Sequence, residues 1–382
     1  MALGSKTRRV LLVLPVAEQG GAESLWVDFL RRYDRRRLIP SVVFLRDGPL
    51  VERVMELGVE TFVQPITRLS NPINYAQAVW KIRRIIERVR AEVIFSSLGY
   101  GHLYGGMAAR LARRPAVWWQ HGVARVENLI DRWASRIPAQ MIIASSEVAA
   151  TAQCRAFGTK REKLRVIYPG VDMERLASPD PSRVDDLRQQ LGLERACGVI
   201  ATIGRLEPGK GQDDFLRAAR RVQLTCKDAR FLVVGSEMFG MNRGYEAQLR
   251  RMALDLGLGQ SVIFTGFRRD ISELLAVCDI LVHAARSPES FGLVLVEAAA
   301  SGKPVVATDV GGPREIVVHE RTGILVPPGQ PEMLAQAITG LLKNPERCRT
   351  MGVAASRHAR ERFDISRAVE QIHDVIEHVA AA

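Results

Sequence analysis

Short runs of β-branched and apolar residues alternate with segments of helical period along this chain. The alternation predicts βα units on a parallel sheet, because two parallel strands need a long crossover and a helix usually provides it. The pattern restarts after residue 170, so we expect two doubly wound units in tandem. Strands are expected at residues 9–15, 41–45, 61–63, 93–96, 116–120 and 141–145, and at 198–203, 230–234, 261–264, 280–283 and 304–308.

The length of 382 residues also favours two domains, since one hydrophobic core rarely serves so long a chain. A Pro-Gly pair in Tyr168-Pro169-Gly170-Val171-Asp172 marks a turn, and we place the hinge at residues 169–172. Residues 354–382 are predicted to be helical, with a break at Phe363-Asp364. This last stretch has too few apolar residues to be a domain, so it should pack against the preceding ones.

Cysteine usage and hydropathy exclude several classes. The five cysteines are scattered and never form a C-x-x-C pair, which argues against a disulfide framework and a zinc site and favours a reducing cytosol. No apolar run approaches the roughly 20 residues that span a bilayer. Residues 6–17 superficially resemble a signal peptide, but no small-residue cleavage site follows, and we interpret them as containing a strand.

The net charge of +12 is concentrated in the first half of the chain. Residues 1–170 hold 27 basic and 14 acidic side chains, whereas residues 171–382 hold 27 and 28. This asymmetry indicates an anionic partner such as a membrane surface, nucleic acid or a phosphorylated substrate, although added solubility would explain it too. In residues 78–90 an apolar face opposes Lys81, Arg84 and Arg88; it is either a helix lying on a sheet or a surface that docks on an anionic leaflet.

Each half opens with a strand, a glycine turn and a helix, at Gly20-Gly21-Ala22-Glu23 and at residues 204–211. Glycine lets backbone approach a ligand closely, and a helix N-terminus attracts anions. Neither loop is a dinucleotide fingerprint or a P-loop, so an ordinary dinucleotide or ATP site is not supported. Such a turn can be purely structural, but Arg205 and Lys210 in the second loop favour a diphosphate ligand.

Two glutamates flank a glycine at residues 288–301. Glu289 is expected in a loop and Glu297 in the apolar helix that follows, with Glu297 buried. A buried carboxylate needs a partner, either a ligand such as a ribose diol or a core arginine, and Glu289 could also be a solvated surface charge. His121 ends the strand at 116–120 and should face a cleft, unless it is structural. His102, in the loop 99–102, is a weaker candidate.

Four ordered motifs resemble those of the retaining GT-B glycosyltransferases of family 4. Glu289 and Glu297 stand in its E-x7-E spacing with Phe291-Gly292 between them, and residues 204–211 resemble its R-x4-K donor loop. Residues 168–172 are similar to its interdomain P-x-G-V-D segment, and residues 20–23 to its amino-terminal glycine loop. The glutamate spacing alone would be weak, but the four motifs together span nearly the whole chain in the family's order.

The resemblance implies a GT-B fold, in which two Rossmann-like domains face each other across a cleft. Residues 1–170 would bind the acceptor, residues 171–360 the donor, and residues 361–382 would form a helix that returns to the first domain. The implied reaction moves a hexose from a UDP- or GDP-sugar to a glycan or lipid-linked acceptor with retention, in polysaccharide, lipopolysaccharide or glycolipid synthesis. The implied location is the cytoplasm, at the inner face of the membrane.

The resemblance also implies a role for each charged candidate. Arg205 and Lys210 would neutralise the leaving diphosphate without a metal or cofactor, which suits the absence of a D-x-D triplet. Glu289 would accept hydrogen bonds from the transferred sugar and Glu297 from the ribose. His121 would orient the sugar near its reacting carbon, and His102 would lie on the acceptor side.

Backbone N–H groups complete the implied donor site. They would hold the phosphates and the sugar from both sides of the cleft and belong to Gly20, Gly21, Phe291, Gly292 and Leu293. Several positions depart from the usual family pattern: Ser290, Ala284-Ala285, and Ser96-Ser97-Leu98 in place of a histidine pair. The first two should leave donor binding intact, whereas the last bears on the identity of the acceptor.

Two other classes stay open at this stage. A GT-B-like nucleotide-sugar epimerase would act on its donor without any acceptor. A basic protein that binds nucleic acid would use the positive first half, but that half lacks the interleaved aromatic residues of a recognisable DNA- or RNA-binding module. The resemblance favours a retaining hexosyltransferase, and the missing aromatic residues argue against nucleic-acid binding.

Overall fold

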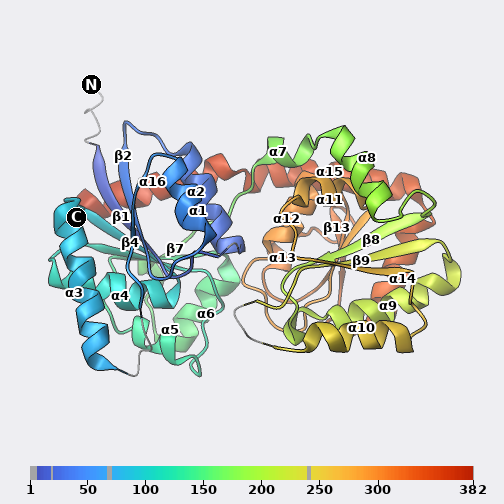
Figure 1. Ribbon diagram of the computed structural model, residues 1–382, viewed down its shortest axis with the longest axis horizontal. Helices are drawn as coiled ribbons and strands as arrows, with labels where there is room; N and C mark the ends of the chain where they lie inside the picture. The colour runs from blue at the N-terminus through green and yellow to red at the C-terminus, as the bar shows by residue number, and fades with distance from the viewer. Residues whose placement is uncertain (1–6, 19, 67–70, 239–241, 382) are drawn as a thin grey trace. The chain divides into compact units, whose positions relative to one another are not determined.

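A computed structural model describes residues 7–18, 20–66, 71–238 and 242–381 of the chain. It divides into two compact units (Figure 1). The N-terminal unit consists of Met1–Gly170 and Ile365–Ala382, and the C-terminal unit of Val171–Asp364. The chain therefore passes from the first unit to the second after Gly170 and returns after Asp364.

The N-terminal unit is built on a parallel sheet with the strand order β3-β2-β1-β4-β5-β6-β7. Its central strands are continuous apolar runs, such as Val10–Leu14 in β1, because helices cover both faces of the sheet. The strands are β1 (Arg8–Leu14), β2 (Leu38–Phe44), β3 (Glu60–Val63), β4 (Val93–Ser97), β5 (Ala116–Gln120), β6 (Met141–Ala144) and β7 (Leu164–Val166).

One helix of this unit comes from the far end of the sequence. Helix α16 (Ile365–Ala381) packs on α1 and buries Ile372 and Ile376 in the same core as β1. Arg37 fixes it from outside, donating to Glu370 and Glu377 at 2.7 Å each. The other helices are α1 (Gly21–Arg32), α2 (Pro49–Glu56), α3 (Pro72–Arg88), α4 (Leu98–Leu111), α5 (Leu129–Ala134), α6 (Glu147–Phe157) and η1 (Arg161–Lys163).

The C-terminal unit repeats the architecture with the strand order β10-β9-β8-β11-β12-β13, again all parallel. Its strands are β8 (Gly198–Ile203), β9 (Ala229–Val234), β10 (Val262–Gly266), β11 (Ile280–His283), β12 (Val305–Thr308) and β13 (Gly323–Val326). Its helices are α7 (Met173–Ala177), α8 (Pro181–Gln190), η2 (Pro208–Lys210), α9 (Gln212–Thr225), α10 (Tyr245–Asp255), α11 (Ile271–Val277), α12 (Leu293–Ala300), α13 (Pro313–Ile316), α14 (Pro331–Leu342) and α15 (Pro345–Phe363).

The two doubly wound units confirm the fold class expected from the sequence, with three differences in detail. Strands β7 and β13 were not predicted; both lie at a sheet edge, where strands are short. Helix α1 begins at Gly21 instead of near Ser24, because Gly20 already occupies the N-cap position. Helix α15 runs on to Phe363, so the chain leaves the C-terminal unit at Asp364, later than residue 360.

The strand orders locate the edge of each sheet where ligands bind. In both sheets the connections reverse direction beside the first strand, between β1 and β4 and between β8 and β11. Open parallel sheets bind ligands at the carboxyl ends of the strands at such a point. Arg205 and Lys210 follow β8, and Glu289 follows β11, so these three residues share one switch point. In the part of the chain that the structure describes, every helix is too short or too polar to span a bilayer.

Candidate functional site

The loops that follow β8 and β11 are joined by their backbones. Gly211 has φ +69°, and a Cβ at this position would lie 1.9 Å from the carbonyl oxygen of Ala284. The N–H groups of Arg286 and Ser287 both donate to the carbonyl of Gly209, at 2.9 and 3.3 Å. The two loops therefore form one surface, and only glycine at position 211 permits their approach.

Lys210 and Glu289 form an ion pair across this surface. The Lys210 Nζ donates to Oε2 of Glu289, and His283 Nε2 lies 3.5 Å from the same oxygen. Both side chains are mostly buried, with 23% of Lys210 and 16% of Glu289 exposed. Burial by itself raises the pKa of Glu289, but the Lys210 charge and the His283 hydrogen bond outweigh it and hold that pKa below its usual range. Glu289 is therefore ionised at neutral pH.

Arg205 lies at the start of the same loop, with its side chain 40% exposed and its Nη2 3.5 Å from Glu207. Gln212 holds the backbone here, donating to the Arg205 carbonyl at 2.7 Å. From the other loop, Arg286 donates to both oxygens of the buried Asp214, at 2.6 and 2.5 Å. A bidentate pair of this kind fixes geometry as well as charge, so it anchors the segment that carries Glu289 to helix α9.

A glycine pair after β12 supports the glutamate loop from behind. The N–H of Gly312 donates to the Glu289 carbonyl at 2.8 Å. A Cβ at Gly311 would lie 2.3 Å from that carbonyl oxygen, and one at Gly312 would lie 2.4 Å from Cα of Phe291. These glycines are therefore required by a contact between backbones. The Phe291 ring is buried against Phe363, with centroids 5.6 Å apart, so only its backbone is available to a ligand.

Helix α12 starts at this surface, and its structure corrects the prediction for Glu297. Gly292 is the N-cap with φ +98°, and Leu293 is the first helical residue. Glu297 is half-buried, not buried as expected. Helical geometry explains this, because Leu295 and Ala299 share one face and position 297 lies on the opposite side.

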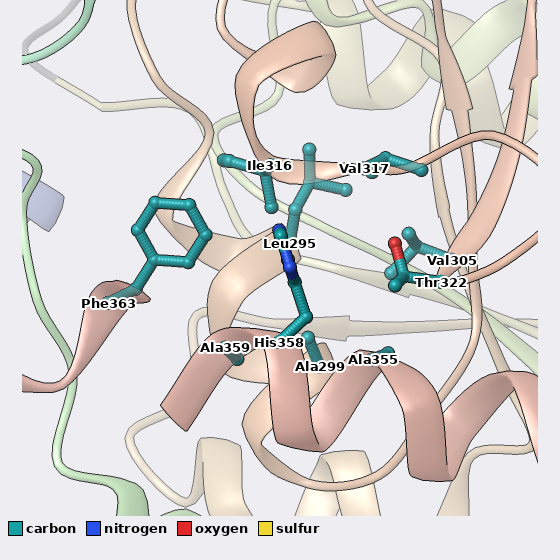
Figure 2. Close-up of a pocket in the computed structure, with 10 residues that line it drawn as sticks. All are labelled: Leu295, Ala299, Val305, Ile316, Val317, Thr322, Ala355, His358, Ala359 and Phe363. Carbon is teal, nitrogen blue, oxygen red and sulfur yellow. The ribbon is translucent and has the colours of Figure 1, made fainter. Parts of the chain in front are cut away.

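The buried face of α12 closes a small pocket, drawn in Figure 2. Leu295 and Ala299 line it from α12, and His358 enters from α15. The remaining lining is apolar apart from Thr322, and the cavity holds about 10 Å³, which suits one water molecule at most. This pocket is too small and too apolar for a nucleotide and lies on the face of α12 opposite to Glu297.

In the N-terminal unit, His121 follows β5 at the carboxyl edge of the sheet, as expected. Its ring stacks on Trp119, with centroids 4.8 Å apart and 16° between the planes. Ser145 Oγ lies 3.5 Å from its Nδ1. Burial lowers the pKa of His121 to about 3, so the ring is neutral at physiological pH.

The structure places His102 differently from the prediction. It lies on helix α4 and not in a loop, and none of its surface is exposed. The ring stacks on Trp118 at 5.0 Å, and its Nε2 lies 3.2 Å from the carbonyl of Ile137. Burial lowers the pKa of His102 to about 4. A side chain so enclosed is a core residue, where no acceptor can reach it.

The glycine loop of the N-terminal unit is also partly helical. Gly20 caps α1, with φ −136°, and Gly21 is in the first turn of the helix. A Cβ at Gly20 would lie 2.6 Å from Oε2 of Glu23, a flexible side chain that can move aside. Gly20 therefore remains at the helix N-terminus that the sequence predicted, while Gly21 belongs to the helix.

Sequence reasoning missed His283, which contacts Glu289 from the end of β11. The signal was available, since His121 was singled out for the same position at the end of a strand. Among the described residues, no group of three or more His, Cys, Asp or Glu side chains is placed to hold a metal ion. What the C-terminal unit offers instead is two cations and an ionised carboxylate, an arrangement that can bind an anion beside a hydroxyl-bearing group.

Comparisons with known proteins identify the family to which the chain belongs. Residues 19–175 match the model of Glycosyltransferase Family 4, and residues 184–358 match that of Glycosyl transferases group 1. The chain is 32% identical over 298 residues to the D-inositol 3-phosphate glycosyltransferase of Rhodococcus opacus, covering 72% of this chain and 65% of that protein, slightly less than two thirds. The protein of the same name from Rhodococcus erythropolis is 31% identical over 341 residues, covering 82% of this chain and 75% of its own.

A solved structure matches the chain over almost its full length. The crystal structure of Anabaena Alr3699/HepE in complex with UDP-glucose superposes with a TM-score of 0.87 at 30% identity, covering 97% of this chain and 99% of that one. The motifs, the two sheet topologies and these relatives agree with one another. The chain therefore belongs to glycosyltransferase family 4, a family of glycosyl-transferring enzymes of the GT-B fold.

Proposed function

We propose that this protein transfers a hexose from UDP-glucose or a related UDP-sugar to a hydroxyl of an anionic, lipid-linked acceptor, with retention of anomeric configuration. The C-terminal unit binds the donor and the N-terminal unit the acceptor. The bond from the sugar C1 to the phosphate oxygen breaks and a bond from C1 to the acceptor oxygen forms on the same face. The acceptor proton passes to the departing phosphate.

The observation that carries this proposal is the Lys210–Glu289 pair beside Arg205 at the switch point of the C-terminal sheet. Two cations on one loop neutralise the diphosphate as it leaves, so the reaction proceeds without a metal or another cofactor. The carboxylate of Glu289 accepts hydrogen bonds from the sugar hydroxyls, and half-buried Glu297 accepts from the ribose. Backbone N–H groups at Phe291, Gly292 and Leu293 contact the phosphates and the sugar.

In the N-terminal unit we assign roles to Gly20 and His121. Gly20 is the N-cap of α1, and a helix N-terminus of this kind suits an anionic group of the substrate. The neutral His121 donates a hydrogen bond to the sugar. UDP is the favoured nucleotide because the Anabaena relative, at 30% identity, was solved with UDP-glucose.

The choice of a lipid-linked acceptor rests on the surface of α3. Trp80 is 47% exposed there, with the guanidinium groups of Arg84 and Arg83 4.4 and 5.4 Å from its ring centroid. Ile73, 67% exposed, lies on the same helix. Exposed tryptophan with arginine suits the interface of an anionic membrane, and the positive charge of residues 1–170 adds to the attraction. We place the protein in the cytoplasm, at the inner membrane face.

A panel of donors tests the reaction. UDP-, GDP- and ADP-sugars are compared by thermal stabilisation, and UDP-glucose should raise the unfolding temperature most, because a bound ligand stabilises the folded state by mass action. Lys210→Ala and Glu289→Gln should each abolish transfer while circular dichroism shows an intact fold. Wild-type turnover in either variant would refute the roles assigned, and release of an altered sugar nucleotide without acceptor would indicate an epimerase.

Vesicles test the acceptor side. The protein should sediment with vesicles that contain anionic phosphatidylglycerol and not with purely zwitterionic ones, and Trp80→Ser should weaken this binding. Leu224→Ser is a matched control, because Leu224 is 64% exposed but lies in the C-terminal unit. Equal sedimentation of wild type and Trp80→Ser would refute the proposal that α3 is the membrane-binding surface.

A second candidate acceptor is D-inositol 3-phosphate, since the two Rhodococcus relatives carry that name. It is also anionic and suits the basic N-terminal unit. Transfer to inositol 3-phosphate at a rate independent of vesicles would favour it over a lipid-linked acceptor.

A further inference from the structure

Ser145 lies beside His121 in the N-terminal unit, and no role has yet been assigned to it. Gln120 and Ala144, the last residues of β5 and β6, are paired in the parallel sheet, so the residues that follow them emerge side by side. These residues are His121 and Ser145. Both are enclosed, with 9% and 1% of their surfaces exposed.

Three side chains form a line of hydrogen bonds at this edge. Trp119 Nε1 is 3.2 Å from Ser145 Oγ, which in turn is 3.5 Å from His121 Nδ1. The indole N–H can only donate, so Ser145 must accept from Trp119. Among the described residues, the Nε2 of His121 is buried and has no hydrogen-bond partner.

In the hydrogen bond between Ser145 Oγ and His121 Nδ1, either partner can be the donor. The two directions leave different groups unsatisfied. If His121 donates from Nδ1, the hydroxyl proton of Ser145 has no acceptor in the described part of the chain, and Nε2 is an unused acceptor as well. If Ser145 donates to Nδ1, the only unsatisfied group of the line is the Nε2–H of His121. Buried polar groups that stay unpaired are costly, so the second arrangement is favoured.

We infer that Ser145 is a positioning residue that fixes the tautomer of His121, so that Nε2 always presents an N–H to the substrate. Donation from Trp119 uses one lone pair of Ser145 and orients its O–H toward Nδ1. The stacked Trp119 ring holds the imidazole plane at the same time. The proton of His121 is thus already on Nε2, the buried ring nitrogen that has no partner in the described part of the chain.

The substrate atom that meets this N–H must be an acceptor. On the function proposed above, on which this step rests, it is an oxygen of the hexose. UDP alone lacks the hexose. Loss of the hydrogen bond between Ser145 and His121 should therefore weaken the binding of UDP-glucose and leave the binding of UDP unchanged. This difference separates a positioning role from a general loss of stability.

The tautomer can be measured directly. In protein labelled with ¹⁵N-histidine, long-range ¹H–¹⁵N correlation distinguishes a protonated Nε2 from a bare one, and the signals of His121 are those lost in His121→Phe. We expect the Nε2–H form in wild type and a mixture with the Nδ1–H form in Ser145→Ala. Ser145→Ala should also bind UDP-glucose about tenfold more weakly while binding UDP like wild type. Ser145→Thr keeps the hydroxyl and should restore both properties.

Ser146→Ala is the matched control. Ser146 is equally buried, but its Oγ accepts from the N–H of Ala149 at 3.0 Å and caps helix α6. Its loss should lower the urea midpoint of the N-terminal unit and leave the tautomer and the UDP-glucose affinity unchanged. Two results would overturn this inference and leave the proposed function standing. One is a wild-type tautomer in Ser145→Ala, and the other is an Nδ1–H form in a wild-type protein that binds UDP-glucose. A wild-type protein that binds no nucleotide sugar would instead contradict the proposed function.

Discussion

Gly211→Ala is the sharpest probe of how the donor loop is held. The new Cβ would lie 1.9 Å from the Ala284 carbonyl oxygen, a contact that real structures do not tolerate below about 3.0 Å. The two loops must therefore separate by about 1 Å. A shift of that size at an active site can reduce turnover by about 100-fold. We expect this loss in kcat/KM for UDP-glucose.

The stability cost can be worked out from the same contacts. Placing alanine at φ +69° costs about 1–2 kcal/mol. Separating the loops also breaks the two hydrogen bonds to the Gly209 carbonyl, worth about 1 kcal/mol each. The free energy of unfolding should therefore fall by about 3–4 kcal/mol, which a domain stable by 5–15 kcal/mol survives.

Gly192→Ala is the matched control, because it adds the same backbone strain without displacing a loop. Gly192 has φ +61°, and a Cβ there would meet nothing within 4 Å, so this variant should lose only about 1–2 kcal/mol and keep full activity. Urea unfolding should be followed by far-UV circular dichroism, because all five tryptophans lie in the other unit. Equal stability and equal kcat/KM in the two variants would refute the idea that the contact with Ala284 positions the loop.

Two further predictions concern pH. His283→Phe removes a hydrogen bond that lowers the pKa of Glu289. The acid limb of the pH profile of kcat/KM for the donor should therefore move to higher pH. An unchanged acid limb would show that His283 does not act on Glu289. His102 and His121 have folded pKa values of about 4 and 3, below the unfolded value of 6.5, so the unfolded state binds more protons between pH 6.5 and 4. Stability should therefore fall as the pH drops from 6.5 to 5, by at most about 1.4 kcal/mol per pH unit for each histidine. Urea titrations followed by tryptophan fluorescence should show this slope in the N-terminal unit, and a flat profile would contradict it.

The central strands could be predicted because both faces of each parallel sheet are covered, which requires unbroken apolar runs. The edge strands β7 and β13 escaped prediction because they are short. Strand β7 is only Leu164–Val166, with two of its residues half-exposed, and so carries little hydrophobic signal. Strand β13 (Gly323–Val326) is mostly buried, but an apolar run of four residues is too short to identify a strand with certainty.

His102 shows why the region after β4 was misread. Gly99 and Gly101 suggested a loop, yet both lie on helix α4. A Cβ at Gly101 would lie 2.9 Å from the Val13 carbonyl oxygen, so this glycine allows the helix to approach the sheet closely. Close packing of two elements and a flexible turn both use glycine, and only the structure separates them.

The donor-site residues were predictable to different degrees. Lys210 and Glu289 could be placed at one edge because the ends of neighbouring parallel strands meet there. Their direct ion pair and the contact with His283 could not, since they depend on how two loops fold against each other. Glu297 was expected to be buried from its apolar neighbours, although the periodicity of the helix already placed it on the other side.

The return of α16 to the N-terminal unit has a consequence for how the protein is made. The core of this unit contains residues from before and after the C-terminal unit, so it cannot be completed until α16 has left the ribosome. The C-terminal unit is contiguous from Val171 to Asp364 and can close earlier. The half of the protein that is synthesised first is thus the last to finish folding, and until then the surface that α16 will cover remains available to chaperones or to aggregation.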